Sequence, residues 1–298
     1  VGSFGAAAAA GKLLGLDVAQ LTHALGIAAS EAAGFQEQFG THGKAFHAGR
    51  ANENGVTAAL LAQGGFTSAK RAIEGPVGFA KLVADEYDLS KIAAYGQPWG
   101  ITDPTFARGI NLKKYPVCAS GLGAIEGMLE LVAEHGIRPE DVAEIDCGVR
   151  SHSLNILMHH QPQTGLQAKF SAEYWVAAPL LDGTFGLLQT TDEMVQRPAV
   201  QALVRKVKVH PDPAIVFPWS KITIRVTLTD GRVLDKLYYP LRGAADNPMS
   251  EAELVEKFHD CAAAGGWAKD RVRLAADLLL GLGALPDVRG LMALLAER

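Results

Sequence analysis

The sequence predicts a protein of the α plus α+β class, in which an all-helical domain that is discontinuous in sequence contains an inserted α+β domain. Two observations lead to this class. The first and last parts of the chain carry apolar residues at helical spacing, whereas the middle contains stretches in which apolar and polar residues alternate as in strands. We therefore expect a helical domain over residues 1–105, an α+β domain over 106–246 and a return to the helical domain over 247–298.

The first part of the chain is expected to form stacked helices up to about residue 95. Asp17 and Gln20 have the spacing of a capping box, in which the Asp side chain accepts from free amides at the helix start while the Gln side chain reaches back. A later helix is predicted from about residue 48 to residue 63, ending at Gly64-Gly65. Ala and Gly occupy many expected contact positions, which allows helix backbones to approach closely and favours a compact bundle.

The middle of the chain contains the predicted strands. Residues 142–149 alternate as a strand does, and residues 221–239 are typical of a hairpin with its turn at 229–232. Between them, residues 168–181 and 199–207 have a helical period. This combination indicates a separate α+β domain.

Helical spacing returns after Asn247-Pro248, where Ser250 and Glu253 have the spacing of a second capping box. Because a helical start, an α+β middle and a helical end follow one another, the middle is expected to be inserted into one helical bundle. No internal repeat or low-complexity linker in the sequence contradicts this organisation.

The composition, with 48% hydrophobic and 20% charged residues, is that of a globular protein with a sizeable core. The sequence contains 28 Lys and Arg residues and 32 Asp and Glu residues, which gives a formal net charge of −4. No general basic field therefore exists to bind nucleic acid or an anionic membrane, so neither is an expected partner. Any anion must be recognised at a local site.

The sequence predicts a cytoplasmic protein without a cofactor or a metal. The Ala-rich run 6–10 is interrupted by Gly11 and Lys12, so it is neither a signal peptide nor a membrane span. The three cysteines form no Cys-x-x-Cys pair and are interpreted as cytosolic thiols. Neither a P-loop nor a dinucleotide-binding glycine motif occurs, and the histidines lack partners at metal-ligand spacing.

A first cluster of polar residues lies at residues 41–50, within an otherwise apolar part of the sequence. It combines His42, Lys44, His47 and Arg50 with two glycines, immediately before the predicted helix at residue 48. The first turn of a helix exposes unpaired amides, which makes this a natural place for an anionic ligand. The alternative interpretation is a solvated loop in which His47 is a side chain at the helix start.

A second cluster occupies residues 113–121 at the predicted domain junction. Lys113 precedes a rigid turn at Tyr115-Pro116, and Ser120 lies beside the Gly of a helix start, an arrangement that suits a carboxylate. The alternative is a linker with two surface lysines. Cys118 beside these lysines would be a nucleophile or a structural thiol, and a hydrolase built on Cys118 or Ser120 is a third hypothesis.

Motifs from one end of the chain to the other resemble the MmgE/PrpD family, which includes 2-methylcitrate dehydratases, cis-aconitate decarboxylases and iminodisuccinate epimerases. They follow the family's order along the sequence. The matching segments are Phe4 to Ala9, Leu25 to Ala28, Gly40 to Ala51, Gly65 to Thr67, Leu112 to Pro116, Ala168 to Ser171, Leu181 to Gly183 and Asn247 to Ser250.

This resemblance implies a discontinuous helical domain carrying an α+β lid, usually as a homodimer, with the active site in the cleft between them. Members act without a cofactor on small di- or tricarboxylates, removing a proton next to a carboxylate before losing water, losing CO₂ or returning the proton. The lysines of the family's Gly-x-x-x-Lys and Lys-x-Tyr-Pro motifs are its cationic positions, here Lys44 and Lys113. The expected substrate-binding residues are Lys44, Lys113, Tyr115 and Ser120, and the expected catalytic residues are His42, His47 and Lys113.

Two features depart from the family pattern. Members carry further catalytic Asp and His residues ahead of the Gly-Ala-Ala helix, and this sequence starts at Val1 without them, so we expect the natural protein to begin upstream. Members also commonly read Tyr-Pro-x-Cys-x-x-x-His, where this chain has Leu122. Leu can neither transfer a proton nor donate a hydrogen bond.

Two hypotheses precede that of a hydrolase. The chain is a lyase or isomerase of small polycarboxylates, or it is a catalytically incompetent fragment that serves as a binding or assembly module. On the same grounds the 298-residue chain alone is expected to be nearly inactive. Dehydration, decarboxylation and epimerisation are not separated by the sequence.

Overall fold

The computed structural model describes residues 1–88, 90, 111–215 and 221–296. Contacts divide the chain into two compact units, Val1–Pro98 and Trp99–Arg298, and each is considered by itself. The predicted boundary at residues 105 and 106, and the end of the first helical stretch near residue 95, lie outside the described residues. The last helices group with the second unit, and their expected packing on residues 1–105 stays a prediction.

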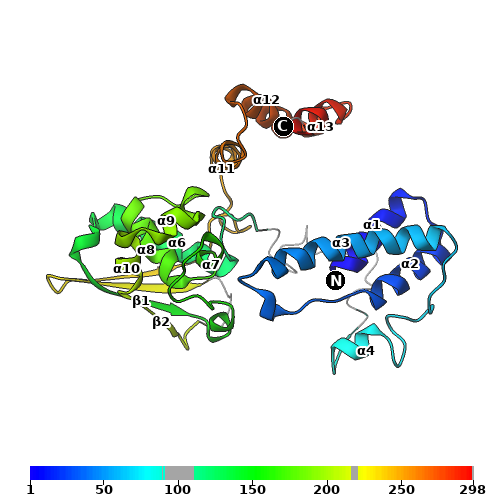
Figure 1. Ribbon diagram of the computed structural model, residues 1–298, viewed down its shortest axis with the longest axis horizontal. Helices are drawn as coiled ribbons and strands as arrows, with labels where there is room; N and C mark the ends of the chain where they lie inside the picture. Colours follow the sequence, from blue (N-terminus) through cyan, green and yellow to red (C-terminus); the bar gives the residue numbers. More distant parts are fainter. Residues whose placement is uncertain (89, 91–110, 216–220, 297–298) are drawn as a thin grey trace. The chain divides into compact units, whose positions relative to one another are not determined.

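The first unit is built from helices, as expected. Its α1 packs along α3, and α2 packs against both (Figure 1). The capping box is confirmed, because Asp17 accepts from the amide of Gln20 while the Gln20 side chain accepts from the amide of Asp17. The helices are α1 (Gly2–Leu13), α2 (Val18–Ser30), α3 (His42–Gln63) and α4 (Phe79–Val83), with a short 3₁₀ turn at Gln36–Gln38.

The start of α3 differs from the expectation. The helix begins at His42, not near residue 48, so the polar cluster lies within the helix instead of in a loop before it. Thr41 is the N-cap, and its hydroxyl accepts from the amide of Gly43 at 3.1 Å. Gly43 fits this first turn because a Cβ there would lie 2.2 Å from the side-chain oxygen of Gln38. The cap overrides the weak helix propensity of the glycines.

Close backbone approach is the main feature of the first unit's core. Its buried residues are almost all small, namely Ala7, Ala24, Ile27, Ala28, Ala58 and Ala62. Gly55 of α3 is the tightest point, since a Cβ there would lie 2.4 Å from the Cβ of Ala6 and 2.6 Å from the backbone nitrogen of Ala7. The expectation that Ala and Gly bring these helices together is confirmed.

We predict that Gly55→Ala lowers the free energy of unfolding by about 1–3 kcal/mol, because the added methyl group forces α1 and α3 apart. The matched control is Gly49→Ala on the same helix, where a Cβ meets nothing within 4 Å. That control should leave stability unchanged or raise it by about 0.5–1 kcal/mol, the helix preference of Ala over Gly. Urea unfolding followed by circular dichroism measures both, and equal effects would contradict the close approach.

The second unit contains a four-stranded mixed sheet in the order β2-β1-β3-β4. β1 pairs with β2 in parallel and with β3 antiparallel, and β3 and β4 form an antiparallel hairpin. Helices α6 and α8 pack on one face of the sheet (Figure 1). The strands are β1 (Val142–Val149), β2 (Val207–Pro211), β3 (Ile222–Leu228) and β4 (Val233–Tyr238).

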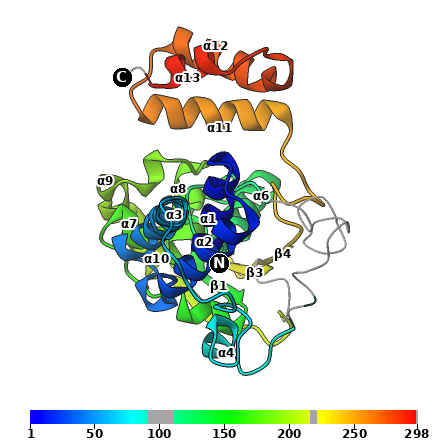
Figure 2. The ribbon, with the colours of Figure 1, turned by 90° about the vertical axis from the view of Figure 1, so that its right-hand side faces the viewer.

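In the sequence of the second unit, one α-helix precedes the sheet, four lie between β1 and β2, and three follow β4 within the described residues. α12 lies against both α11 and α13 (Figure 2). The capping box of Ser250 and Glu253 opens α11, as expected. The helices are α6 (Leu122–His135), α7 (Gly165–Ala168), α8 (Ala172–Asp182), α9 (Asp192–Gln196), α10 (Pro198–Val204), α11 (Glu251–Ala264), α12 (Lys269–Leu280) and α13 (Arg289–Ala296).

The α plus α+β class is confirmed, with local differences. The hairpin and the strand at residues 142–149 form where they are predicted. The helix expected over 168–181 is divided into α7 and α8, because Ser171 caps a new helix by accepting from the amide of Tyr174. The helix expected over 199–207 ends at Val204, and Val207 begins β2.

None of the helices within the described residues has both the length and the apolar character that a membrane span requires.

Candidate functional site

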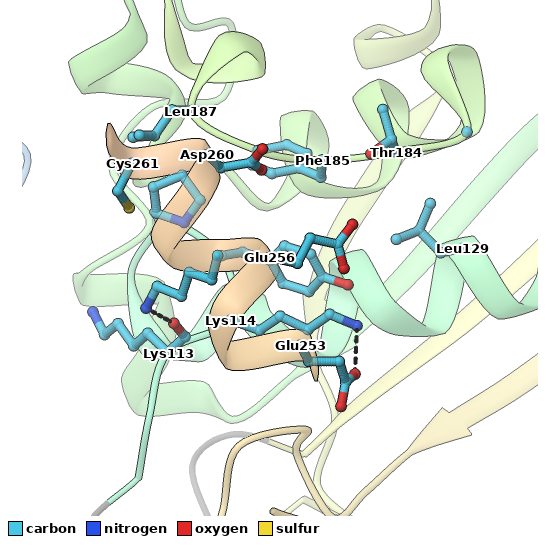
Figure 3. A pocket seen from close by; sticks show the side chains of 15 residues that line it. Lys113, Lys114, Leu129, Thr184, Phe185, Leu187, Glu253, Glu256, Asp260 and Cys261 are labelled. Carbon is cyan, nitrogen blue, oxygen red and sulfur yellow. Dashed lines mark hydrogen bonds and ion pairs between the residues drawn. The ribbon is translucent and has the colours of Figure 1, made fainter. Parts of the chain in front are cut away.

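The predicted Lys-x-Tyr-Pro segment lines a pocket of about 430 Å³ within the second unit (Figure 3). One face of α11 forms the opposite wall, and the loop Gly183–Leu187 after α8 completes it. The charged residues of the lining are Lys113, Lys114, Glu253, Glu256, Lys257 and Asp260. The pocket therefore combines apolar side chains with charges of both signs.

Hydrogen bonds within the chain hold the three lysines of this pocket. The Lys113 ammonium donates to the carbonyl of Val117 at 2.9 Å. Lys114 lies 3.1 Å from Glu126 and 3.4 Å from Glu253. Lys257 donates to the main-chain carbonyl of Lys113 (Figure 3). These bonds position cationic side chains from two segments of the chain around one cavity.

Glu253 is the most strongly bonded carboxylate of the pocket. It accepts from the guanidinium of Arg242, with the Arg242 Nε at 3.0 and 3.1 Å from its two oxygens, and from the amide and hydroxyl of Ser250 at 2.8 and 3.1 Å. These interactions lower the pKa of Glu253 to about 2. The hydrogen bonds from Arg242 have the largest effect, followed by those from Ser250 and by the positive charge of Lys114. The ordinary value of this pKa is 4.5.

This pKa predicts an acid dependence of stability. Because the folded-state pKa of Glu253 is below its unfolded value, its stabilising contribution is complete above pH 4.5 and is lost as the pH falls towards about 2. In the variant Glu253→Gln, the decrease of the unfolding free energy over this range should be shallower, and stability at neutral pH should be lower. Urea unfolding at a series of pH values measures both.

The control for this prediction is Glu251→Gln, an exposed residue in the first turn of the same helix. If the two variants had the same pH profile, the bonds of Glu253 would not contribute to stability.

Tyr115 is buried, with 5% of its surface exposed, although it lines the pocket. Its hydroxyl donates to Glu126, and its ring packs edge-on against Phe185 with the centroids 6.1 Å apart. Burial and the neighbouring Glu126 carboxylate raise the pKa of Tyr115 well above its usual range. The phenol is therefore neutral at physiological pH and would contact a ligand as an uncharged group.

Ser120 lies outside the lining of this pocket. It is 8% exposed in the 3₁₀ turn before α6, with the Cys118 sulfur 3.9 Å from its hydroxyl oxygen. Among the described residues, neither side chain makes a hydrogen bond to a histidine or a carboxylate that would activate it. The hydrolase hypothesis therefore gains no support.

Leu122, at the position where the family's motif commonly has His, is the first residue of α6 and is 4% exposed. It belongs to the hydrophobic core that includes Trp175 and Ile125. In the adjacent turn, a Cβ at Gly121 would lie 2.4 Å from the Trp175 ring, so the backbone packs directly on the indole. In this chain, residue 122 therefore contributes to the packing of the hydrophobic core.

The α3 residues belong to the first unit and are considered separately. His42 and Lys44 are exposed in the first turn, with the Lys44 ammonium 5.7 Å from the ring centre of Phe39. His47 is half-buried and lines a second pocket of about 400 Å³. His42 and Lys44 lie outside that lining.

The second pocket also contains Glu31, Phe35, Arg50 and Asn54. The ring of His47 meets that of Phe35 edge-on at 5.7 Å. One side-chain oxygen of Glu31 is buried and has no hydrogen-bond partner within the described part of the chain. This pocket therefore offers a histidine, an arginine and an unsatisfied acceptor to a ligand.

The structure thus brings Lys113 and Tyr115 together in one pocket and places His47 in another. The prediction that Lys44 and Lys113 share a cleft stays a prediction, since the two units are described separately. Lys257 and the pocket role of Glu253 could not be predicted from the sequence, because α11 contributes both residues from more than 100 residues away. The capping-box spacing located Glu253 but gave no sign of its contact with Lys114.

Within the described residues, no group of three or more His, Cys, Asp or Glu side chains is arranged to hold a metal ion. His160 is instead bonded through Nδ1 to the buried carboxylate of Glu173 at 2.7 Å.

Comparisons with known proteins agree with the sequence motifs. The MmgE/PrpD N-terminal domain matches residues 1–91, and the MmgE/PrpD C-terminal domain matches residues 115–281. Cis-aconitate decarboxylase of Homo sapiens is 30% identical over 266 residues, covering 87% of this chain and 54% of the relative. Cis-aconitate decarboxylase of Aspergillus terreus is 28% identical over 316 residues, covering 97% and 62%.

A third relative is 2-methylcitrate dehydratase of Cupriavidus necator, which is 27% identical over 233 residues, covering 72% of this chain and 46% of the relative. The chain therefore spans about half to three fifths of the length of these three relatives.

Proposed function

Because the chain belongs to the MmgE/PrpD family, we propose that it supplies the carboxylate-binding machinery of a lyase or isomerase that acts on a small di- or tricarboxylate. The observation that carries this proposal is the pocket of about 430 Å³ in which the motif residue Lys113 lies beside Lys114 and Lys257. The names of the relatives, cis-aconitate decarboxylase and 2-methylcitrate dehydratase, favour a tricarboxylate.

In the proposed mechanism, Lys44 and Lys113 bind substrate carboxylates. An ammonium group has three N–H donors, so Lys113 can contact a carboxylate while it donates to Val117. Positive charge at a carboxylate stabilises the negative charge that develops when the neighbouring carbon loses a proton. Tyr115, whose phenol is neutral, would contact a ligand without adding charge. Ser120 remains a proposed further donor, although it lies outside the lining of this pocket.

His42 and His47 are the proposed proton carriers. A neutral imidazole accepts the proton from the carbon next to the carboxylate. The carbanion then expels hydroxide, which leaves as water once protonated, or takes a proton back on the other face. In a decarboxylation the electrons of the C–CO₂⁻ bond move to carbon as CO₂ leaves, and that carbon takes a proton from the imidazolium form of a histidine. Each outcome is balanced without a cofactor or a metal, and we propose a cofactor-independent reaction in a cytoplasmic homodimer.

We predict that Lys44→Ala and Lys113→Ala each weaken the binding of a tricarboxylate by about 10- to 100-fold, because each removes a charge-assisted hydrogen bond of about 1.5–3 kcal/mol. Isothermal titration of the 298-residue chain with cis-aconitate and 2-methylcitrate measures the affinity. The matched control is Lys70→Ala, an exposed lysine of the first unit. Unchanged affinity in Lys44→Ala or Lys113→Ala would contradict the assigned role.

The second candidate function is a catalytically incompetent binding or assembly module, and the core position of Leu122 favours it. It predicts that the 298-residue chain binds a tricarboxylate but does not convert it. Proton NMR of the ligand, incubated with the chain at a concentration that saturates binding, detects dehydration, decarboxylation and epimerisation in one experiment. New ligand signals that depend on Lys113 would support the lyase or isomerase, and binding without such signals would support the module.

A further inference from the structure

Helix α11 contacts two successive residues of the Lys-x-Tyr-Pro segment, Lys113 and Lys114. Glu253 lies 3.4 Å from the ammonium of Lys114, and one helical turn later Lys257 donates to the main-chain carbonyl of Lys113 (Figure 3). The first contact pairs two charged side chains. The second joins an ammonium to the peptide group of the very residue whose side chain the proposed function assigns to the substrate, across 144 residues of sequence.

We propose that Lys257 is a positioning residue for Lys113. Its bond fixes the peptide plane that follows the Lys113 Cα, and this plane, together with the preceding one, determines the direction of the Cα–Cβ bond. The Lys113 side chain then reaches the carbonyl of Val117 at 2.9 Å. Two hydrogen bonds, one at the main chain and one at the ammonium, therefore hold Lys113 in the pocket wall.

The role is specific to Lys257 among the pocket's cations. Lys114 is paired with Glu126 and Glu253, so its charge is balanced within the chain. Lys257 bonds to a neutral carbonyl, so its bond orients a peptide group without neutralising a carboxylate. This inference rests on the proposed function for its consequence in substrate binding, and on geometry alone for the position of Lys113.

The first test needs no substrate. The rate at which a water-soluble acylating reagent modifies the Lys113 amine is measured by mass spectrometry of the corresponding peptide. In Lys257→Met, where Lys113 leaves its bond to Val117 more often, the rate should rise about fivefold, which corresponds to the loss of one hydrogen bond of about 1 kcal/mol. Lys257→Arg, which keeps a donor, should restore the rate of the parent chain.

The matched control for labelling is Lys269→Met, the same substitution at the exposed first residue of α12. Circular dichroism and thermal unfolding establish that each variant is folded, and Lys257→Gln replaces Lys257→Met if the latter does not fold. A Lys113 rate in the folded Lys257 variant equal to that in Lys269→Met would overturn the proposal.

The second test separates positioning from general stabilisation by a double-mutant cycle on tricarboxylate binding. If Lys257 acts through Lys113, Lys257→Met weakens binding about tenfold in the parent chain but has no further effect when Lys113→Met is already present. Equal effects of Lys257→Met in the two backgrounds would overturn the proposal.

The two tests distinguish this inference from the proposed function. A parent chain that binds no tricarboxylate, but whose Lys113 labelling responds to Lys257→Met, would refute the function and support the positioning role. Tight tricarboxylate binding by the parent chain, together with an unchanged Lys113 labelling rate in Lys257→Met, would support the proposed function and refute the positioning role.

Discussion

The carboxylate of Glu253 joins the loop after the hairpin and the start of α11, which are neighbours in the sequence, to the distant Lys114. It accepts from Arg242 after the hairpin, from Ser250 at the start of α11, and lies 3.4 Å from Lys114. Through Lys114 the network continues to Glu126 of α6. The side chains of Glu253, Arg242 and Lys114 are only 22%, 30% and 27% exposed. Removing one of these charges would leave partly buried charges without their counterparts, which is more damaging than losing an exposed ion pair. The shape of the pocket therefore depends on this carboxylate.

The parts of the fold that could be predicted from the sequence are those decided by local chemistry. Both capping boxes and the hairpin are specified by residues a few positions apart, and the structure has them where they are predicted. β2 could not be predicted, because its five residues form a strand through parallel pairing with β1, more than 50 residues earlier. The start of α3 was placed too late because glycines and charged residues are typical of loops, and the cap at Thr41 outweighs them only when the turn is already formed.

The residues of the candidate site also divide into those that a local motif predicts and those that depend on distant contacts. Lys113 and Tyr115 were predicted from a short motif, and both line the pocket. Lys257 was not predicted, because a lysine on an amphipathic helix carries no sign in the sequence of the carbonyl it will contact. Leu122 shows the opposite case, in which the sequence revealed a departure from the family pattern and the structure supplied its consequence, a packed core position.

The two sets of expected site residues are held by different physical means. α3, which carries His42, Lys44 and His47, is positioned by close packing of small residues against α1, with Gly55 at the contact. Such packing depends on shape and is insensitive to ionic strength. Lys113, which is exposed, is positioned by two hydrogen bonds: its ammonium donates to the carbonyl of Val117, and Lys257 donates to the carbonyl of Lys113 itself. At an exposed site each such bond contributes only about 0.5–1.5 kcal/mol, so it orients the side chain without withdrawing the ammonium from a ligand. The orientation of Lys113 therefore depends on hydrogen-bond geometry at a solvent-accessible pocket wall, whereas the position of α3 depends on the fit of a packed core.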